Sequence, residues 1–155
     1  MSFDSPSFDS SMEKNLSGRK IAIVRSLWNK NITDLLLQSA TNYLKSVGLN
    51  KDDILIKNVP GSMELVYGCN EMIEKENVDG VIALGCIIKG ETDHDQYISN
   101  AVSNGLVSVS LKYSKPVIFG VLTTNNLNQA INRCGGKDGD KGLDSARSLV
   151  YLLCN

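Results

Sequence analysis

Histidine is the side chain that ordinarily changes charge near neutral pH, and this sequence contains a single one, His94. It lies in the segment G-C-I-I-K-G-E-T-D-H-D, residues 85–95, and is the natural candidate for a general base working near neutral pH. The neighbouring Asp93 and Asp95 would favour the charged ring, whereas the N-terminus of a helix beginning there would favour the neutral ring. The sequence leaves open which influence dominates, and whether His94 is catalytic or simply exposed in a helical turn.

The same segment has glycines spaced as in a phosphate-binding loop of the G-x-x-x-x-G-K-[ST] type. Gly85 and Gly90 match, but Glu91 stands at the lysine position, so nucleotide triphosphate binding is rejected. Thr92 is predicted to cap the next helix, with Asp95 closing a capping box. The backbone N–H groups of residues 90–92 would then form an anion site for a phosphate, unless the segment is an ordinary strand-to-helix turn.

A second polar segment, V-P-G-S-M-E-L, covers residues 59–65. Its Pro60-Gly61 pair predicts a turn, and Ser62 is a natural N-cap for a following helix. Glu64 would lie in the first turn of that helix, where a carboxylate complements the dipole. A functional alternative stays open, in which this rim of N–H groups and the carboxylate bind a polyhydroxyl ligand.

Two further side chains have chemistry that suits a phosphorylated or aromatic ligand. Trp28, the only tryptophan, lies in a predicted loop and would either stack on a flat heterocycle or cover the core. Arg133 lies at the end of a predicted helix, where a cation suits the dipole, and it could equally bind a phosphate through two hydrogen bonds. Lys137 and Lys141 follow in G-G-K-D-G-D-K-G, which is predicted to be mobile.

The elements that must position these residues are predicted by four apolar runs rich in Ile and Val, at residues 20–24, 53–59, 80–88 and 116–124. The runs are continuous rather than alternating, which predicts strands buried on both faces. Helical patterns follow them at residues 33–47, 62–73, 95–113, 127–134 and 143–153. This alternation predicts an α/β fold with an open parallel sheet and helices on both faces. Ligands bind such sheets at the carboxyl ends of the strands, so the site is expected among residues 26–29, 60–64, 89–94 and 123–126.

Composition agrees with one soluble domain of 155 residues, of which 42% are apolar and 21% charged. Residues 1–17 show no periodicity and are predicted to form a flexible arm before a domain at residues 18–155. The net charge of −1 argues against a general nucleic-acid binder. No apolar run approaches the ~20 residues of a membrane span, and the polar first residues do not resemble a signal peptide.

Cysteine usage predicts a reducing, cytoplasmic-type compartment. Cys69, Cys86, Cys134 and Cys154 form no C-x-x-C pair, and with one histidine they lack the spacing of a zinc site, so no metal is expected. Cys69 and Cys86 lie in apolar stretches typical of buried free thiols. Four cysteines could in principle form two disulfides instead.

Taken together, these segments resemble one family, the lumazine synthases of riboflavin biosynthesis. The resemblance covers residues 20–153 and rests on five motifs in order: W-N in the first loop, V-P-G-S-x-E, G-C-I-I-K-G-x-T-x-H, P-V-I-F-G-V-L-T-T, and N-R-x-G followed by D-K-G-L-D. It implies a flavodoxin-like three-layer fold with a four-stranded parallel sheet flanked by helices. It also implies condensation of 5-amino-6-(D-ribitylamino)uracil with 3,4-dihydroxy-2-butanone 4-phosphate to 6,7-dimethyl-8-ribityllumazine, phosphate and water, with no metal and no organic cofactor.

The resemblance also assigns roles to residues. His94 would transfer protons, Trp28 would stack on the pyrimidine, and Phe119 from an adjacent subunit would close the aromatic pocket. The pyrimidine and its ribityl chain would be held by Ser62, Met63, Glu64, Cys86, Ile87 and Ile88. The phosphate would be bound by Glu91, Thr92, Arg133 and Lys141.

Three positions depart from the family's pattern. Glu91 replaces a small residue and is kept only as a backbone contact, because its carboxylate would repel a phosphate. Asp93 replaces a common threonine, and Met63 replaces an aromatic residue. The affinity for the phosphate substrate and the pH optimum are the properties these changes affect.

The resemblance implies self-association into a pentamer, with a 60-subunit shell weakly favoured, and riboflavin synthase as a pathway partner. A non-catalytic relative that binds a lumazine or flavin is one rival, but His94, Arg133 and Lys141 favour the enzyme. A flavodoxin-like regulatory module is another. It would need a phosphate-cradling first loop or an acidic phosphoacceptor, and residues 26–31, S-L-W-N-K-N, supply neither.

Overall fold

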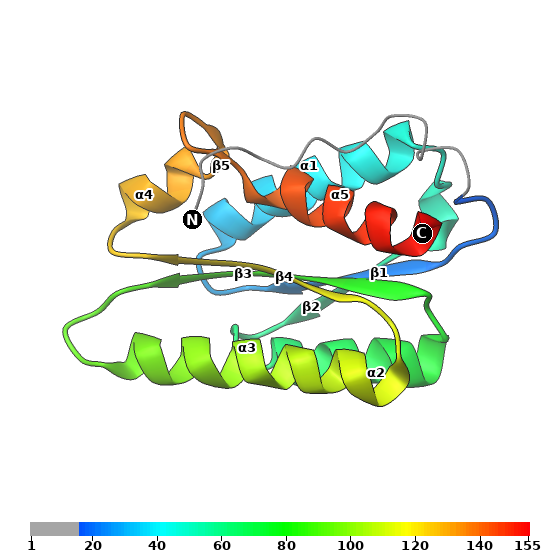
Figure 1. The fold of residues 1–155 in the computed structure, drawn as a ribbon. Coiled ribbons are helices and arrows are strands. Elements are labelled where there is room, and N and C mark those ends of the chain that lie inside the picture. The colour runs from blue at the N-terminus through cyan, green and yellow to red at the C-terminus, as the bar shows by residue number, and fades with distance from the viewer. Residues whose placement is uncertain (1–15) are drawn as a thin grey trace.

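A computed structural model describes residues 16–155, which form a parallel sheet between two layers of helices (Figure 1). The strands lie in the order β2-β1-β3-β4, and all neighbouring pairs are parallel. Their bounds are β1 (Ile21–Ser26), β2 (Ile54–Val59), β3 (Gly80–Ile88) and β4 (Val117–Thr124). The predicted α/β class, with four parallel strands flanked by helices, is confirmed.

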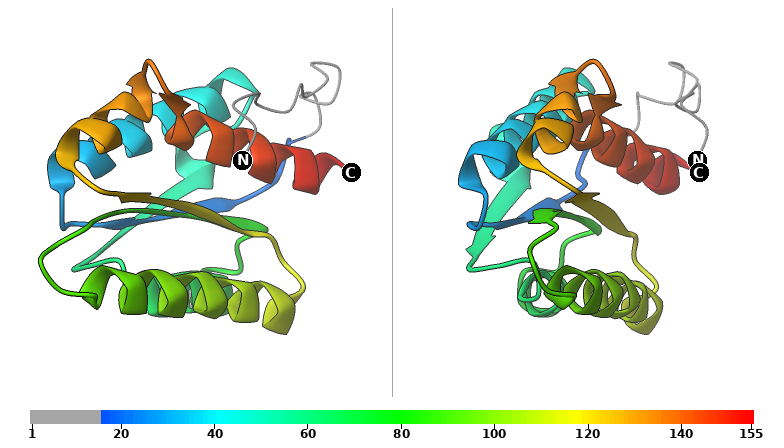
Figure 2. Two further views of the ribbon diagram at one scale, coloured as in Figure 1. Left: turned by 60° about the vertical axis from the view of Figure 1, so that its left-hand side comes forward. Right: turned by 90° about the vertical axis from the view of Figure 1, so that its left-hand side faces the viewer.

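Helices α1 (Lys30–Ser46), α4 (Leu127–Asn132) and α5 (Lys141–Cys154) cover one face of the sheet (Figure 2). Helices α2 (Leu65–Glu76) and α3 (His94–Tyr113) cover the other face, and a short 3₁₀ turn, η2 (Lys51–Asp53), precedes β2. No helix within residues 16–155 combines the length and apolar composition that a membrane span requires.

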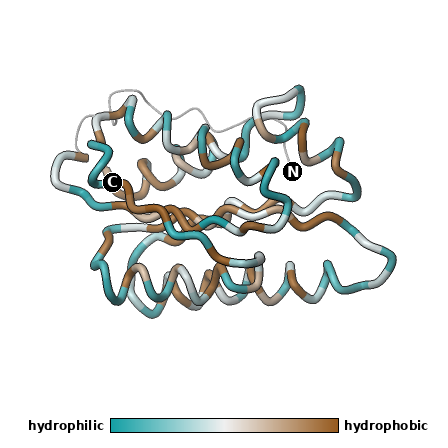
Figure 3. Tube along the Cα trace, turned by 180° about the vertical axis from the view of Figure 1, so that it is seen from behind, coloured by the Kyte–Doolittle hydropathy of each residue, from teal (hydrophilic) through white to brown (hydrophobic). Residues whose placement is uncertain are grey.

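Each face of the sheet carries its own apolar core, because successive strand residues point to opposite sides. On the first face Ile21 and Ile23 of β1 pack with Leu36 of α1 and Leu149 of α5. On the second face the intervening Ala22 and Val24 pack with residues of α2 and α3. The hydropathy colouring shows the apolar residues concentrated in the strands and on the helix sides that face them (Figure 3).

A close contact between α1 and α5 holds the first layer together. A Cβ atom at Gly142 would lie 2.3 Å from the backbone oxygen of Leu36, so only glycine allows this approach. The contact holds the first turn of α5, which includes Lys141, against α1.

The prediction that all four strands are buried on both faces was wrong for β2. Central strands β1 and β3 are buried along almost their whole length, whereas in β2 only the end residues Ile54 and Val59 are buried, and Ile56 is 50% exposed. The reason is position, since β2 is an edge strand and β1 lies on only one side of it.

The glycine-rich segment after α4 has regular structure, and its mobility stays a prediction. It forms an antiparallel hairpin of β5 (Cys134–Gly136) and β6 (Gly139–Asp140), and α4 ends at Asn132 instead of residue 134. The predicted arm, residues 1–17, lies outside the described residues except for its last two. Of these, Leu16 is 2% exposed and belongs to the core on the α1 and α5 side.

Candidate active site

A cavity of about 640 Å³ opens at the carboxyl ends of the strands, as expected for an open parallel sheet. Its walls come from the loop after β1, the loop after β2, the end of β3 and the start of α3. Nine of the predicted site residues line it, and we call them the cavity group: Trp28, Ser62, Met63, Glu64, Cys86, Ile87, Ile88, Thr92 and His94. The remaining lining residues are Asn29, Gly61, Gly90, Asp95 and Ile98.

The loop after β1 presents Trp28 to this cavity with 73% of its surface exposed. The loop is anchored through its backbone, because the N–H of Leu27 donates to the carbonyl of Val59 (2.9 Å) and that of Trp28 to the carbonyl of Pro60 (3.1 Å). An exposed indole on an anchored backbone is suited to stacking on a flat ligand. It covers no core, so the alternative structural role is not supported.

Asn29 joins this loop to the end of β3 and is not among the predicted site residues. It adopts the left-handed conformation at φ 54°, ψ 46°, which asparagine tolerates better than most residues. Its side-chain amide donates to the carbonyl of Cys86 (2.9 Å). The residue type was a signal for this conformation, because a left-handed residue immediately before a helix is usually Asn or Gly.

A cluster of charged residues stiffens the same end of the sheet. The buried guanidinium of Arg25, at the end of β1, donates to Oδ1 of Asn58 on β2 (3.0 and 2.8 Å) and forms an ion pair with Asp34 of α1. A hydrogen bond from Lys30 and the nearby Arg25 charge hold the pKa of Asp34 below its usual value. The loop that bears Trp28 therefore lies between Arg25 and Asp34, and the ion pair between these two residues holds both of its ends.

In the loop after β2, the predicted capping role of Ser62 was wrong. Helix α2 begins at Leu65, and Glu64 is its N-cap residue. The Glu64 carboxylate instead accepts a hydrogen bond from the backbone N–H of Gly61 (2.8 Å), closing the turn. Ser62 is left as a lining residue with 7% of its surface exposed, and Gly85 makes room for it, since a Cβ there would lie 2.8 Å from the serine Oγ.

At the start of α3 the predicted capping box was also wrong. The N-cap residue is Asp93, and no side chain caps the helix. Thr92 is therefore free of the predicted cap and lines the cavity, as does His94, which is the first residue of the helix. Glu91 is exposed and does not line the cavity.

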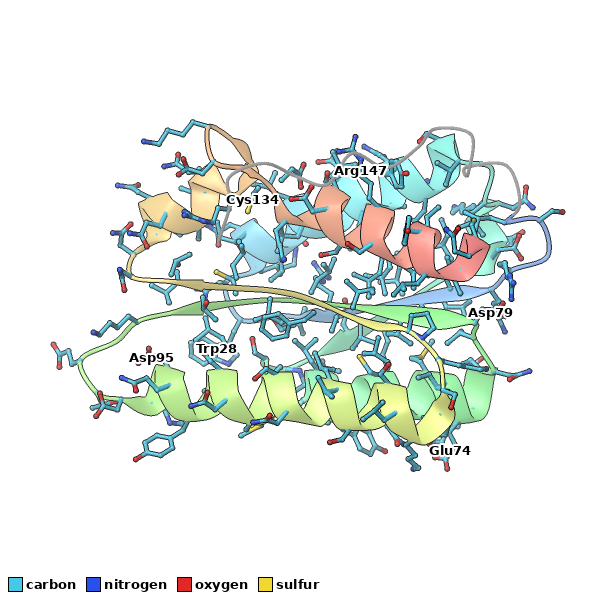
Figure 4. All side chains as sticks on the ribbon, in the orientation of Figure 1. Trp28, Glu74, Asp79, Asp95, Cys134 and Arg147 are labelled. Carbon is cyan, nitrogen blue, oxygen red and sulfur yellow. The ribbon has the colours of Figure 1, made fainter. Side chains whose placement is uncertain are left out.

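The other predicted site residues, Phe119, Arg133 and Lys141, do not line this cavity, and we call them the outer group. Phe119 lies in β4, partly buried against the core on the α2 and α3 side. Arg133 and Lys141 are brought together by the hairpin, because the Lys141 N–H donates to the Arg133 carbonyl (2.9 Å). They lie next to Cys134, on the opposite side of the sheet from α3 (Figure 4).

The Arg133 guanidinium already has partners within the chain. It donates to the carbonyl of Gln129 (3.2 Å) and lies 3.6 Å from a carboxylate oxygen of Asp138. Its side chain is 40% exposed, so this ion pair is weak and open to solvent.

The four cysteines are all free thiols, which confirms the prediction for Cys69 and Cys86. Burial raises the pKa of Cys86 to about 12, with a further contribution from Cys134. A thiol of this kind stays protonated at neutral pH and is a poor nucleophile. Cys86 therefore contributes its backbone to the cavity wall rather than a reactive sulfur.

Comparison with known proteins gives one consistent result. A family model described as 6,7-dimethyl-8-ribityllumazine synthase matches residues 18–154. A protein of that name from Cytophaga hutchinsonii is 48% identical over 139 residues, covering 90% of this chain and 87% of its own. Another from Bacteroides fragilis is 42% identical (86% of this chain, 94% of its own), and one from Rhodopirellula baltica is 40% identical (96% and 95%).

Proposed function

Because this chain belongs to the 6,7-dimethyl-8-ribityllumazine synthase family, we propose that its cavity is where the lumazine of riboflavin biosynthesis is assembled. The chain has the synthase activity of that family and is a transferase. The proposed substrates are 5-amino-6-(D-ribitylamino)uracil and 3,4-dihydroxy-2-butanone 4-phosphate. The observation that carries the proposal is the convergence of nine residues from four separate segments on one cavity.

In the proposed arrangement, each wall of the cavity holds a different part of the substrates. Trp28 stacks on the pyrimidine ring, whose edge bonds to the backbone of residues 86–88. The ribityl chain lies along Ser62, Met63 and Glu64. Thr92 and the backbone around Gly90 receive the phosphate at the start of α3, where N–H groups and the helix dipole favour an anion.

The chemistry asks for little beyond positioning and proton transfer. The pyrimidine amine attacks the ketone carbon and water leaves, giving an imine. Phosphate then departs, the resulting enol becomes a ketone, and the ribityl-bearing nitrogen attacks that ketone carbon, closing the ring with loss of a second water. His94 is the first residue of α3 and lines the cavity, and it accepts and donates protons in these steps. Holding the amine and the ketone together supplies most of the rate enhancement.

The proposed site is completed by a second copy of the chain. Phe119, Arg133 and Lys141 would reach the cavity of a neighbouring subunit in a pentamer, with a 60-subunit shell as a larger form of the same contact. The support is that all three stand outside the cavity of their own chain, while Trp28 stays widely exposed. Riboflavin synthase would act next, and the four free thiols favour a reducing, cytoplasmic-type compartment.

The test follows lumazine by absorbance and fluorescence while phosphate release is measured in the same reaction. Equal amounts of lumazine and phosphate are expected from the purified protein with both substrates. A matched Trp28→Ala variant should need far more pyrimidine to reach the same rate. Tight binding of preformed lumazine without turnover would instead mean a binding protein, and the proposal would be wrong.

A further inference from the structure

We propose that Asp95 is a further substrate-binding residue of this site, whose carboxylate accepts a hydrogen bond from the hydroxyl group of the phosphorylated four-carbon substrate. The inference rests on the function proposed above and adds to it a residue that selects a hydroxylated substrate. Asp95 is the second residue of α3 and immediately follows His94.

One oxygen of this carboxylate is buried without a hydrogen-bond partner. Among the described residues, Asp95 Oδ1 has less than 1 Å² accessible and no donor within reach. Ser99, one turn later on the helix, uses its hydroxyl on the backbone carbonyl of Asp95 (2.6 Å). Buried polar atoms are nearly always satisfied, and leaving one unpaired is costly. Rotation about the last side-chain bond, which is soft in aspartate, would turn this oxygen toward the cavity, where a donor from outside this chain can reach it.

The position of Asp95 points to a ligand as that donor. Asp95 and Ile87 line both the main cavity and a second cavity of about 220 Å³ beside it. The other residues of the second cavity are mostly polar: Lys89, Ser99, Thr123, Thr124 and Asn125. Asp95 thus lies between the main cavity and the second, polar cavity, which we call the recess. It is at the same end of the molecule as Trp28 (Figure 4).

Charge decides which part of the substrate meets Asp95. A carboxylate repels a phosphate and accepts hydrogen bonds from hydroxyl groups. The phosphate belongs with Thr92 and the backbone N–H groups at the start of α3, and the pyrimidine belongs on Trp28. The hydroxyl next to the phosphate-bearing carbon is the donor that remains, and Lys89 in the adjoining recess offsets the negative charge.

Two unreactive ligands test this assignment, because 2-hydroxybutyl phosphate and butyl phosphate differ only in that hydroxyl. Their dissociation constants are measured by calorimetry on the assembled wild-type protein and on Asp95→Ala and Asp95→Asn. Wild type should prefer the hydroxylated ligand by about tenfold. Asp95→Ala should lose this preference, and Asp95→Asn, which keeps an acceptor oxygen and the size of the side chain, should retain part of it.

The neighbouring Asp93→Asn is the matched control, since Asp93 lines neither cavity and its substitution removes the same charge. Its preference should equal that of wild type. An unchanged preference in Asp95→Ala, or none in wild type, would overturn the proposal while lumazine formation by the same wild-type sample still supported the function. Failure of both ligands to bind wild type would overturn the proposed phosphate site and this inference with it.

Discussion

The cavity group and the outer group are built in opposite ways. The cavity group is assembled by one chain, on loops tied to each other by backbone hydrogen bonds and by the amide of Asn29. The outer group lies away from that cavity, and its principal cation, Arg133, forms an ion pair with Asp138 of its own chain. Within residues 16–155, one chain therefore prepares a place for an aromatic ring but supplies no lysine or arginine to the cavity lining for a phosphate.

The walls of the main cavity are preorganised, whereas the outer group is not. Buried Arg25, the left-handed Asn29 and the Glu64–Gly61 hydrogen bond all fix the walls around Trp28 before any ligand arrives. The outer group instead has one weak, solvent-exposed ion pair to break. Changes in the cavity group should act on turnover and pyrimidine binding, and changes in the outer group on phosphate binding.

The largest expected effect is in the cavity group, from His94→Gln. Loss of proton transfer should lower kcat by about 100-fold, at the low end of general acid–base effects, because positioning is retained. The Michaelis constants of both substrates should change little. Steady-state kinetics with each substrate varied in turn measures this, and an unchanged kcat would remove His94 from the mechanism.

The next largest effect is expected in the outer group, from Arg133→Ala. Loss of a charge-assisted hydrogen bond to a phosphate should raise the KM for the butanone phosphate by about 30-fold, and the KM for the pyrimidine far less. Arg133→Lys is the matched variant, which keeps the charge and loses the bidentate hydrogen bonds. Its KM for the butanone phosphate should lie between those of wild type and Arg133→Ala. Equal increases in both constants would contradict the assignment of Arg133 to the phosphate.

The sequence predicted that members of the cavity group would lie near one another, because they occur in short segments directly after strands. Once parallel strands were recognised from continuous apolar runs such as residues 80–88, their carboxyl ends had to meet at one edge. Local capping was predicted less well. Ser62 and Thr92 are good caps by residue type, yet the helices begin at Leu65 and His94, and their N-cap residues are Glu64 and Asp93.

Other features depend on distances that no local pattern contains. Asp95 was assigned to a capping box, and only its packing beside Ser99 and the two cavities shows an unpaired oxygen. The partial exposure of β2 follows from its place at the sheet edge, which strand patterns alone do not specify. The separation of Arg133 from the cavity is likewise a property of the tertiary structure, whereas the family resemblance had already placed Phe119 at the site of an adjacent subunit.

A mixing experiment tests whether the two groups act across a subunit boundary. Trp28→Ala and Arg133→Ala damage different groups, and each alone should lose activity by about tenfold or more. If every site combines two chains, random co-assembly of equal amounts should rebuild about a quarter of the sites. Activity of the co-refolded mixture should then clearly exceed the mean of the parents. A mixture that never exceeds the mean would mean that each site belongs to one chain.

The smallest effect expected concerns the ion pair that holds Arg133 in the free chain. Asp138→Asn removes the partner of the guanidinium, so Arg133 should reach a phosphate more readily and the KM for the butanone phosphate should fall about twofold to threefold, in keeping with an exposed pair worth at most ~1 kcal/mol. Asp144→Asn, in the first turn of α5, removes the same charge without breaking an ion pair within residues 16–155 and is the control. Because salt screens exposed charges, the advantage of Asp138→Asn should shrink as ionic strength rises. An advantage equal to that of Asp144→Asn would show that only net charge matters, and that the outer group is not held back by Asp138.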